Sequence, residues 1–155
     1  MAWFDGFEKH TTTVNGLTVA FRRSCDWANT RPVLVLLHGF PQTHVLWQRV
    51  AQQLQHRYRL LMPDLRGYGD SSHAVGDAEH LHYSKRAMAQ EIVALLDHLG
   101  VQDFFLCGHD RGGRVAHRLA VDHPQRVKKL CVIDIAPTLD MYKATDFDFA
   151  RLYYH

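Results

Sequence analysis

Residues 104–113 read FFLCGHDRGG, and this stretch decides how the rest of the chain is interpreted. Phe104–Leu106 is a short apolar run that suits a buried strand, and Arg114–Ala120 has the spacing of an amphipathic helix. Between them, Gly108 and Gly112 stand on either side of the turn. A turn this sharp leaves no room for side chains beside its central residue. The stretch therefore predicts a nucleophile elbow, in which a strand, a tight turn and a helix present one reactive side chain.

Asp110 occupies the centre of this turn, where such elbows usually carry serine. A carboxylate can attack an alkyl carbon and form an ester, so this residue changes the chemistry that the elbow can perform. The alternative is an aspartate that only caps the following helix, because aspartate is a preferred N-cap residue. We expect the nucleophile, because the glycines and the strand–helix context are both present.

The bulk composition narrows the class of protein. A chain of 155 residues, 46% hydrophobic and 22% charged, suits one domain with a core of its own. A formal net charge of +2 gives no reason to expect nucleic acid or an anionic membrane as a partner. No apolar run approaches the roughly 20 residues that span a bilayer.

The cysteines and the N-terminal residues bear on the cellular compartment. Cys107 and Cys131 lie in apolar, strand-like runs and are predicted to be reduced thiols in the core, whereas Cys25 lies in a polar loop. The sequence has no CxxC pair, and its first residues do not resemble a secretory signal. These features predict a cytoplasmic protein.

Strand and helix patterns alternate along the chain. The Asn15-Gly16 pair predicts a hairpin turn within residues 11–21. Further strands are expected at residues 32–37, 59–63, 104–106 and 130–133. Helices are expected at residues 45–55, from a cap at Ser84 to Gly100, from the elbow to about residue 123, and from residue 146 onward. Strands that alternate with helices after a hairpin indicate an α/β fold with a mainly parallel sheet and helices on both faces.

Three motifs stand in the order and spacing of the α/β-hydrolase superfamily: HGFP at 38–41, DLRGYGDS at 64–71 and GHDRG at 108–112. Within this superfamily, the chain resembles one branch in having an aspartate at the nucleophile position. That branch holds haloalkane dehalogenases, epoxide hydrolases and haloacetate dehalogenases. Arg111 together with Arg114 resembles the fluoroacetate (haloacetate) dehalogenases in particular. The resemblance implies hydrolysis without a metal or organic cofactor, a small haloacid as substrate, and a homodimer.

The resemblance also implies a division of the chain. Residues 1–140 are expected to form the N-terminal part of the hydrolase core, and residues 141–155 the start of a helical cap. In the superfamily the catalytic histidine follows the last strand, after the nucleophile and the acid. We therefore expect residues 1–155 to be the N-terminal half of an enzyme whose last strands, catalytic histidine and most of the cap lie further on. The sheet would then end on an apolar edge that is open to pairing.

Arg111 and Arg114 are predicted to hold the substrate. Arg114 lies one helical turn beyond Asp110, which brings it toward the same face. Two guanidinium groups beside a nucleophilic carboxylate stabilise its charge and weaken its attack. Their presence is explained if the substrate is itself an anion that they bind. A haloacetate carboxylate suits a bidentate guanidinium. The alternatives are a solvated helix start or structural ion pairs, and Arg118 is predicted to be such a pair.

The resemblance implies roles for several further residues. The backbone N–H groups of Phe40 and Arg111 would form an anion hole, with the Phe40 ring as an apolar wall. Asp134 would orient the catalytic histidine, or would be an ordinary aspartate at the end of a strand. His155 would help to hold the departing halide. His38 is expected to be a hydrogen-bonded structural residue rather than a base.

The resemblance, together with Asp110, Arg111 and Arg114, implies a hydrolytic dehalogenase that acts on short 2-haloacids such as fluoroacetate, through displacement by Asp110 and an ester intermediate. An epoxide hydrolase is the enzymatic alternative, but it requires two cap tyrosines, a role to which Tyr153 and Tyr154 cannot be assigned. A hydrolase-like binding protein without turnover is the third hypothesis. His73, His80 and His82 lie in a polar stretch without a matching set of carboxylates, so no metal site is expected.

Overall fold

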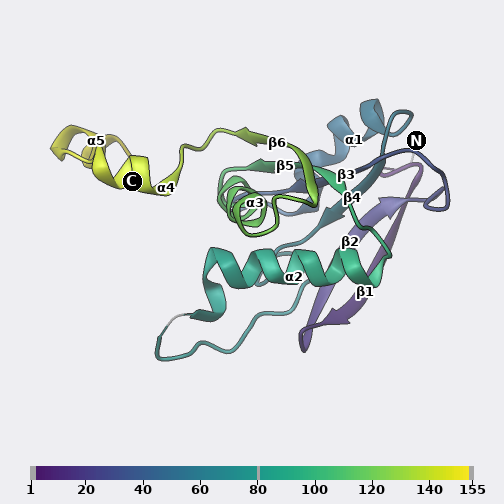
Figure 1. Ribbon diagram of the computed structural model, residues 1–155, viewed down its shortest axis with the longest axis horizontal. Helices are drawn as coiled ribbons and strands as arrows, with labels where there is room; N and C mark the ends of the chain where they lie inside the picture. Colours follow the sequence, from purple (N-terminus) through teal and green to yellow (C-terminus); the bar gives the residue numbers. More distant parts are fainter. Residues whose placement is uncertain (1–2, 80, 154–155) are drawn as a thin grey trace.

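The computed structural model describes residues 3–79 and 81–153, which form one six-stranded sheet with helices on both faces (Figure 1). The strand order is β1-β2-β4-β3-β5-β6. The strands are β1 (Phe7–Val14), β2 (Leu17–Ser24), β3 (Val33–Leu37), β4 (Arg59–Pro63), β5 (Phe104–His109) and β6 (Val127–Ile133). The helices are the 3-10 helices η1 (His44–Trp47) and η2 (Leu81–Tyr83), and α1 (Gln48–Leu54), α2 (Lys85–His98), α3 (Arg111–Asp122), α4 (Thr138–Lys143) and α5 (Phe147–Tyr153).

The predicted hairpin joins β1 to β2, and its turn carries the two residues that the sequence singled out. Asn15 and Gly16 have φ angles of 51° and 77°, the left-handed region that this short turn requires. Strand β2 of the hairpin also pairs antiparallel with β4. The remaining neighbours, β4 with β3, β3 with β5 and β5 with β6, pair in parallel. The predicted α/β fold with a mainly parallel sheet is confirmed.

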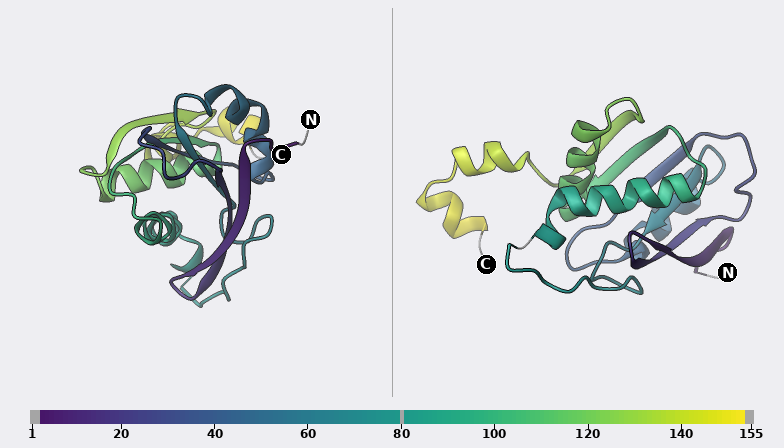
Figure 2. Two further views of the ribbon diagram at one scale, coloured as in Figure 1. Left: turned by 90° about the vertical axis from the view of Figure 1, so that its right-hand side faces the viewer. Right: turned by 60° about the horizontal axis from the view of Figure 1, so that its bottom comes forward.

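Helices cover the two faces of the sheet unequally. In the left view of Figure 2, α1 lies on one side of the sheet, and α2 and α3 lie on the other. The larger core cluster joins apolar residues of α2 and α3, such as Ile92 and Leu119, to strand residues such as Val35 and Leu106. A smaller cluster packs Trp47 and other residues against the opposite face. The continuous apolar runs of β3 and β5 follow from burial on both faces.

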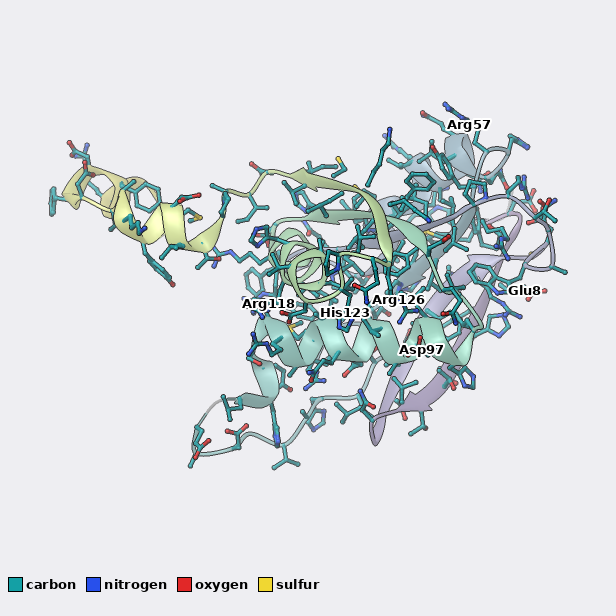
Figure 3. The ribbon with its side chains drawn as sticks, in the orientation of Figure 1. Glu8, Arg57, Asp97, Arg118, His123 and Arg126 are labelled. Carbon is teal, nitrogen blue, oxygen red and sulfur yellow. The ribbon has the colours of Figure 1, made fainter. Side chains whose placement is uncertain are left out.

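Helix α2 begins and ends where the sequence predicts. Ser84 accepts a hydrogen bond from Ala87 N at the first turn, and Gly100 follows the helix with a φ of 69°. Near its C-terminal end Asp97 forms an ion pair with Arg126, at 2.8 Å (Figure 3). This contact joins the end of α2 to the turn before β6.

Three local predictions differ from the structure. The 45–55 segment starts as the 3-10 helix η1, and Leu46 and Val50 are exposed although Trp47 is buried. Helix α4 was not predicted, because its six residues carry no sustained apolar periodicity. The prediction that Cys131 lies in the core is wrong, since every residue of β6 after Val127 is exposed.

The exposure of β6 has a structural cause. Among the described residues, β6 lies at the edge of the sheet and pairs on one side with β5, and the described helices leave its outer part uncovered. Leu130, Val132 and Ile133 are each about 40% exposed. Beyond β6, α4 and α5 extend away from the sheet as an arm (Figures 1 and 2). The division into a core over 1–140 and a cap over 141–155 stays a prediction. No helix within the described residues is long and apolar enough to cross a membrane.

Candidate active site

The backbone at Asp110 has the strained geometry of an elbow. Its φ of 47° and ψ of −116° lie in a region that residues with a side chain rarely adopt. The packing requires the flanking glycines, because a Cβ at Gly108 would lie 2.3 Å from Gly112 O, and one at Gly112 would lie 2.4 Å from Leu37 O and His38 O. The Asp110 side chain makes no capping hydrogen bond to α3. The helix-capping alternative is therefore wrong.

Three segments meet at the Asp110 carboxylate. Its Oδ2 accepts a hydrogen bond from Phe40 N at 2.8 Å, and its own backbone N donates to Ile133 O at 3.0 Å. A Cβ at Gly39 would lie 2.6 Å from Asp110 Cβ, so glycine lets the turn after β3 approach this closely. The Phe40 amide, which the resemblance assigns to an anion hole, thus binds the carboxylate itself. These contacts fix the direction of the carboxylate at the ends of β3, β5 and β6.

The carboxylate faces a cavity of about 440 Å³. Its lining includes the predicted residues Phe40, Asp110 and Asp134. The remaining lining residues are Gln42, His109, Ile135, Ala136, Met141 and Phe149. Apart from Phe40, the apolar part of this lining comes from α4, α5 and the segment that leads to them, so a substrate would lie between the sheet edge and this arm.

Arg111 and Arg114 lie beside the cavity but are not among its lining residues. The Arg111 guanidinium lies 5.7 Å from the centre of the Phe40 ring and 6.0 Å from that of Tyr68. Arg114 Nη2 lies 3.7 Å from Met141 Sδ, and its side chain lines a smaller neighbouring cavity. Neither arginine forms an ion pair with a described residue, unlike Arg118, which pairs with Asp122 as predicted. The structural ion-pair alternative therefore has no support in the described part of the chain.

Lys85 adds a third positive charge that sequence reasoning missed. Burial lowers the pKa of Lys85, the charges of Arg111 and Arg114 lower it further, and Asp110 raises it. The first turn of α2 thus places an amine within electrostatic reach of both arginines and the carboxylate. Lys85 is 25 residues before Asp110 and carries no motif of its own, so only the packing of α2 against α3 reveals it.

Asp134 lies in the cavity as predicted, at the end of β6 and with a φ of 54°. Its carboxylate Oδ2 lies 3.9 Å from His109 Nε2, which is too long for a hydrogen bond. His109 Nδ1 is buried and has no hydrogen-bond partner among the described residues. The sequence could have suggested His109, which stands directly before Asp110, but its side-chain direction depends on the elbow. Whether Asp134 orients a histidine base stays a prediction.

A buried polar network supports the loops around the cavity. His38 is fully buried, accepts a hydrogen bond from Leu65 N at 3.0 Å and bonds through Nδ1 with Gly39 O, so its predicted structural role is confirmed. Asp64 accepts hydrogen bonds from the backbone N and the ring Nδ1 of His44. Burial alone would raise the pKa of Asp64, but the bonds and charge of His44 outweigh it and lower the pKa.

The remaining histidines that the sequence singled out are His155 and the group of His73, His80 and His82. His155, predicted to bind halide, and His80 lie outside the described residues. His82 bonds through Nδ1 with Val75 O and lies 3.3 Å from Asp77. Across residues 3–79 and 81–153, no group of three histidine, cysteine, aspartate or glutamate side chains could hold a metal ion.

The chain belongs to the α/β-hydrolase family, because a family model described as the alpha/beta hydrolase fold matches residues 32–154. It is 46% identical to a fluoroacetate dehalogenase of Burkholderia sp. over 98% of this chain and 49% of the relative. It is also 35% identical to a soluble epoxide hydrolase of Corynebacterium sp. over 84% of this chain and 42% of the relative.

Solved structures agree with this assignment. An α/β-hydrolase candidate from Nostoc sp. PCC 7120 superposes with a TM-score of 0.92, at 47% identity, over 98% of this chain and 51% of its own. A variant of Vigna radiata epoxide hydrolase gives a TM-score of 0.79, at 31% identity, over 96% of this chain and 45% of its own. The chain thus spans about half the length of the curated relatives it matches.

Proposed function

We propose that this chain carries the nucleophile half of a hydrolytic dehalogenase for short 2-haloacids such as fluoroacetate. The observation that carries the proposal is the Asp110 carboxylate, held on a strained elbow and aimed into a cavity, with two arginines nearby that have no ion-pair partner among the described residues. A carboxylate nucleophile suits attack on an alkyl carbon. The nearby guanidinium groups suit a substrate that is itself an anion.

In the proposed reaction an oxygen of Asp110 forms a bond to the carbon that bears the halogen. The carbon–halogen bond breaks, the halide leaves with the electron pair, and an ester remains on the enzyme. The Phe40 amide holds Asp110 Oδ2, which leaves Oδ1 as the attacking oxygen. Hydrolysis of the ester requires a base that activates water, and the resemblance puts that histidine beyond residue 155. The described residues would thus perform the first step.

An epoxide hydrolase is the second candidate, because relatives with this name are 32–36% identical to the chain. Both activities use the same nucleophile, but an epoxide carries no charge that two arginines would bind. The positive potential of Arg111, Arg114 and Lys85 beside Asp110 therefore favours the haloacid. It would give a neutral epoxide no binding energy and would lower the nucleophilicity of the carboxylate.

Release of halide tests the proposal against the alternatives. The purified chain is incubated with chloroacetate, with fluoroacetate and, separately, with styrene oxide, and free halide and diol are measured over time. With the cysteines blocked beforehand, the proposal predicts halide in an amount approaching one per chain from at least chloroacetate, none with the Asp110→Asn variant, and no faster reaction with the epoxide. Faster epoxide opening would favour the second candidate. Binding of chloroacetate without halide release would favour a non-catalytic binding protein.

A further inference from the structure

Cys107 and Cys131 are direct neighbours across β5 and β6. The two residues are Cα partners in the parallel register of these strands, so their side chains point to the same face of the sheet. Neighbouring strands lie about 4.8 Å apart. A disulfide requires Cα atoms about 4.4–6.8 Å apart, so the strand register alone brings this pair within bonding range.

The two thiols differ in their surroundings. Cys107 packs in the buried cluster on the α1 face, together with residues such as Leu36 and Met62. Cys131 is exposed, because the described helices leave β6 open. Burial raises the pKa of Cys107 to about 12, and the charge and hydrogen bond of Cys131 act in the same direction. In the described part of the chain, the exposed Cys131 is therefore the thiol of this pair that an oxidant would reach first, and Cys107 lies beside it.

We propose that Cys107 and Cys131 form a reversible redox pair that closes to an intrachain disulfide when the protein meets a peroxide. The Cys131 sulfur attacks one peroxide oxygen, the O–O bond breaks, and a sulfenic acid and water (or an alcohol) are formed. The Cys107 sulfur then attacks the Cys131 sulfur, and the hydroxyl group leaves as water with the Cys107 proton. The two thiols lose two electrons in total, which the peroxide gains.

The position of the pair gives the disulfide a consequence for the fold. Cys107 stands three residues before Asp110, and Cys131 three residues before Asp134, so both strands lead directly into the cavity. The bond would join the exposed edge strand β6 covalently to the centre of the sheet. The bond would close a loop that contains all of α3 and so lower the conformational entropy of the unfolded chain. It would therefore raise the midpoint temperature of thermal unfolding.

The test uses the full 155-residue chain with Cys25→Ser, which removes the third cysteine. The reduced protein is treated with hydrogen peroxide, blocked with a thiol reagent, and analysed by intact mass and by tryptic mapping without reduction. The proposal predicts loss of two hydrogens, a linked pair of peptides that contain Cys107 and Cys131, and full reversal by dithiothreitol. It also predicts a higher midpoint of thermal unfolding and slower amide exchange in β6 for the oxidised form.

Matched variants separate this outcome from unspecific oxidation. With Cys25→Ser/Cys131→Ser, the remaining Cys107 should stay a free thiol, whereas with Cys25→Ser/Cys107→Ser the remaining Cys131 should form sulfenic acid or a disulfide-linked dimer. The wild-type chain should form the same internal bond. Oxidation of Cys131 alone in the Cys25→Ser chain, or dimers linked through Cys131 while Cys107 remains free, would overturn the proposal. These results do not depend on the dehalogenase assignment.

Discussion

At the scale of single residues, the charges beside Asp110 set the expected substrate. We predict that Arg111→Met and Arg114→Met each slow halide release from chloroacetate by at least about tenfold, because each loses a charge-assisted hydrogen bond of about 1.5–3 kcal/mol. Arg118→Met is the control, since Arg118 lies on the same helix but pairs with Asp122. The measurement is the initial rate of halide release. Equal rates for all three variants would contradict the clamp.

Asp64 gives a prediction about pH. Its folded pKa lies below its ordinary value of 3.8, so its contribution to stability is complete above about pH 3.8 and is lost as the pH falls through the folded pKa. Asp64→Asn should lower the free energy of unfolding by about 2 kcal/mol at neutral pH, because the bonds to His44 weaken. Below pH 3.8 the variant should lose less further stability than the wild type. Urea unfolding across this range checks both parts, and parallel pH profiles would refute the assignment.

The residues show where sequence reasoning succeeds. Asp110 and the flanking Gly108 and Gly112 could be predicted, because a sharp turn permits few residue types and so produces a recognisable sequence pattern. Lys85 could not be predicted as part of the site, because the packing of α2 against α3 places it there. The position of His109 directly before Asp110 could suggest the residue, but not the direction of its side chain, which depends on the elbow. No local pattern in the sequence reports such contacts.

At the scale of elements, the strand–turn–helix unit of β5 and α3 depends on Gly112. Alanine usually favours a helix over glycine by about 1 kcal/mol, but a Cβ here would lie 2.4 Å from the carbonyl oxygens of Leu37 and His38. We predict that Gly112→Ala costs about 3 kcal/mol of stability, since the clash outweighs the propensity. Gly76→Ala, where nothing lies within 4 Å, should change stability by less than about 0.5 kcal/mol. Similar unfolding midpoints for the two variants would show that the elbow tolerates a side chain.

The elements also show what limits a prediction made from sequence. The hairpin, the parallel strands and α2 follow from turn residues, apolar runs and a serine cap, which all act within a few residues. The apolar run of β6 correctly predicts a strand but not its exposure, because burial depends on what covers the strand. The misplacement of Cys131 in the core has the same cause.

At the scale of the whole 155-residue chain, the edge of β6 that no described strand pairs with should govern association. It presents unpaired backbone groups and exposed apolar side chains, a combination that promotes pairing between chains. We predict concentration-dependent self-association of the wild-type chain, and less of it for Val132→Lys at similar thermal stability. Sedimentation velocity over a range of concentrations measures this. Equal association of both proteins would mean that copies meet elsewhere, as a homodimer of the kind that the resemblance implies could do.

The role of Asp110 as a carbon nucleophile is the central feature of the proposed reaction. The most direct test treats the chain with chloroacetate and locates any carboxymethyl group by intact mass and peptide mapping, with Asp110→Asn as the control. We predict an ester on Asp110 that alkaline hydroxylamine removes, and no such adduct in the variant. Alkylation confined to cysteine, or a hydroxylamine-sensitive adduct that persists when Asp110 is replaced, would contradict this role of Asp110.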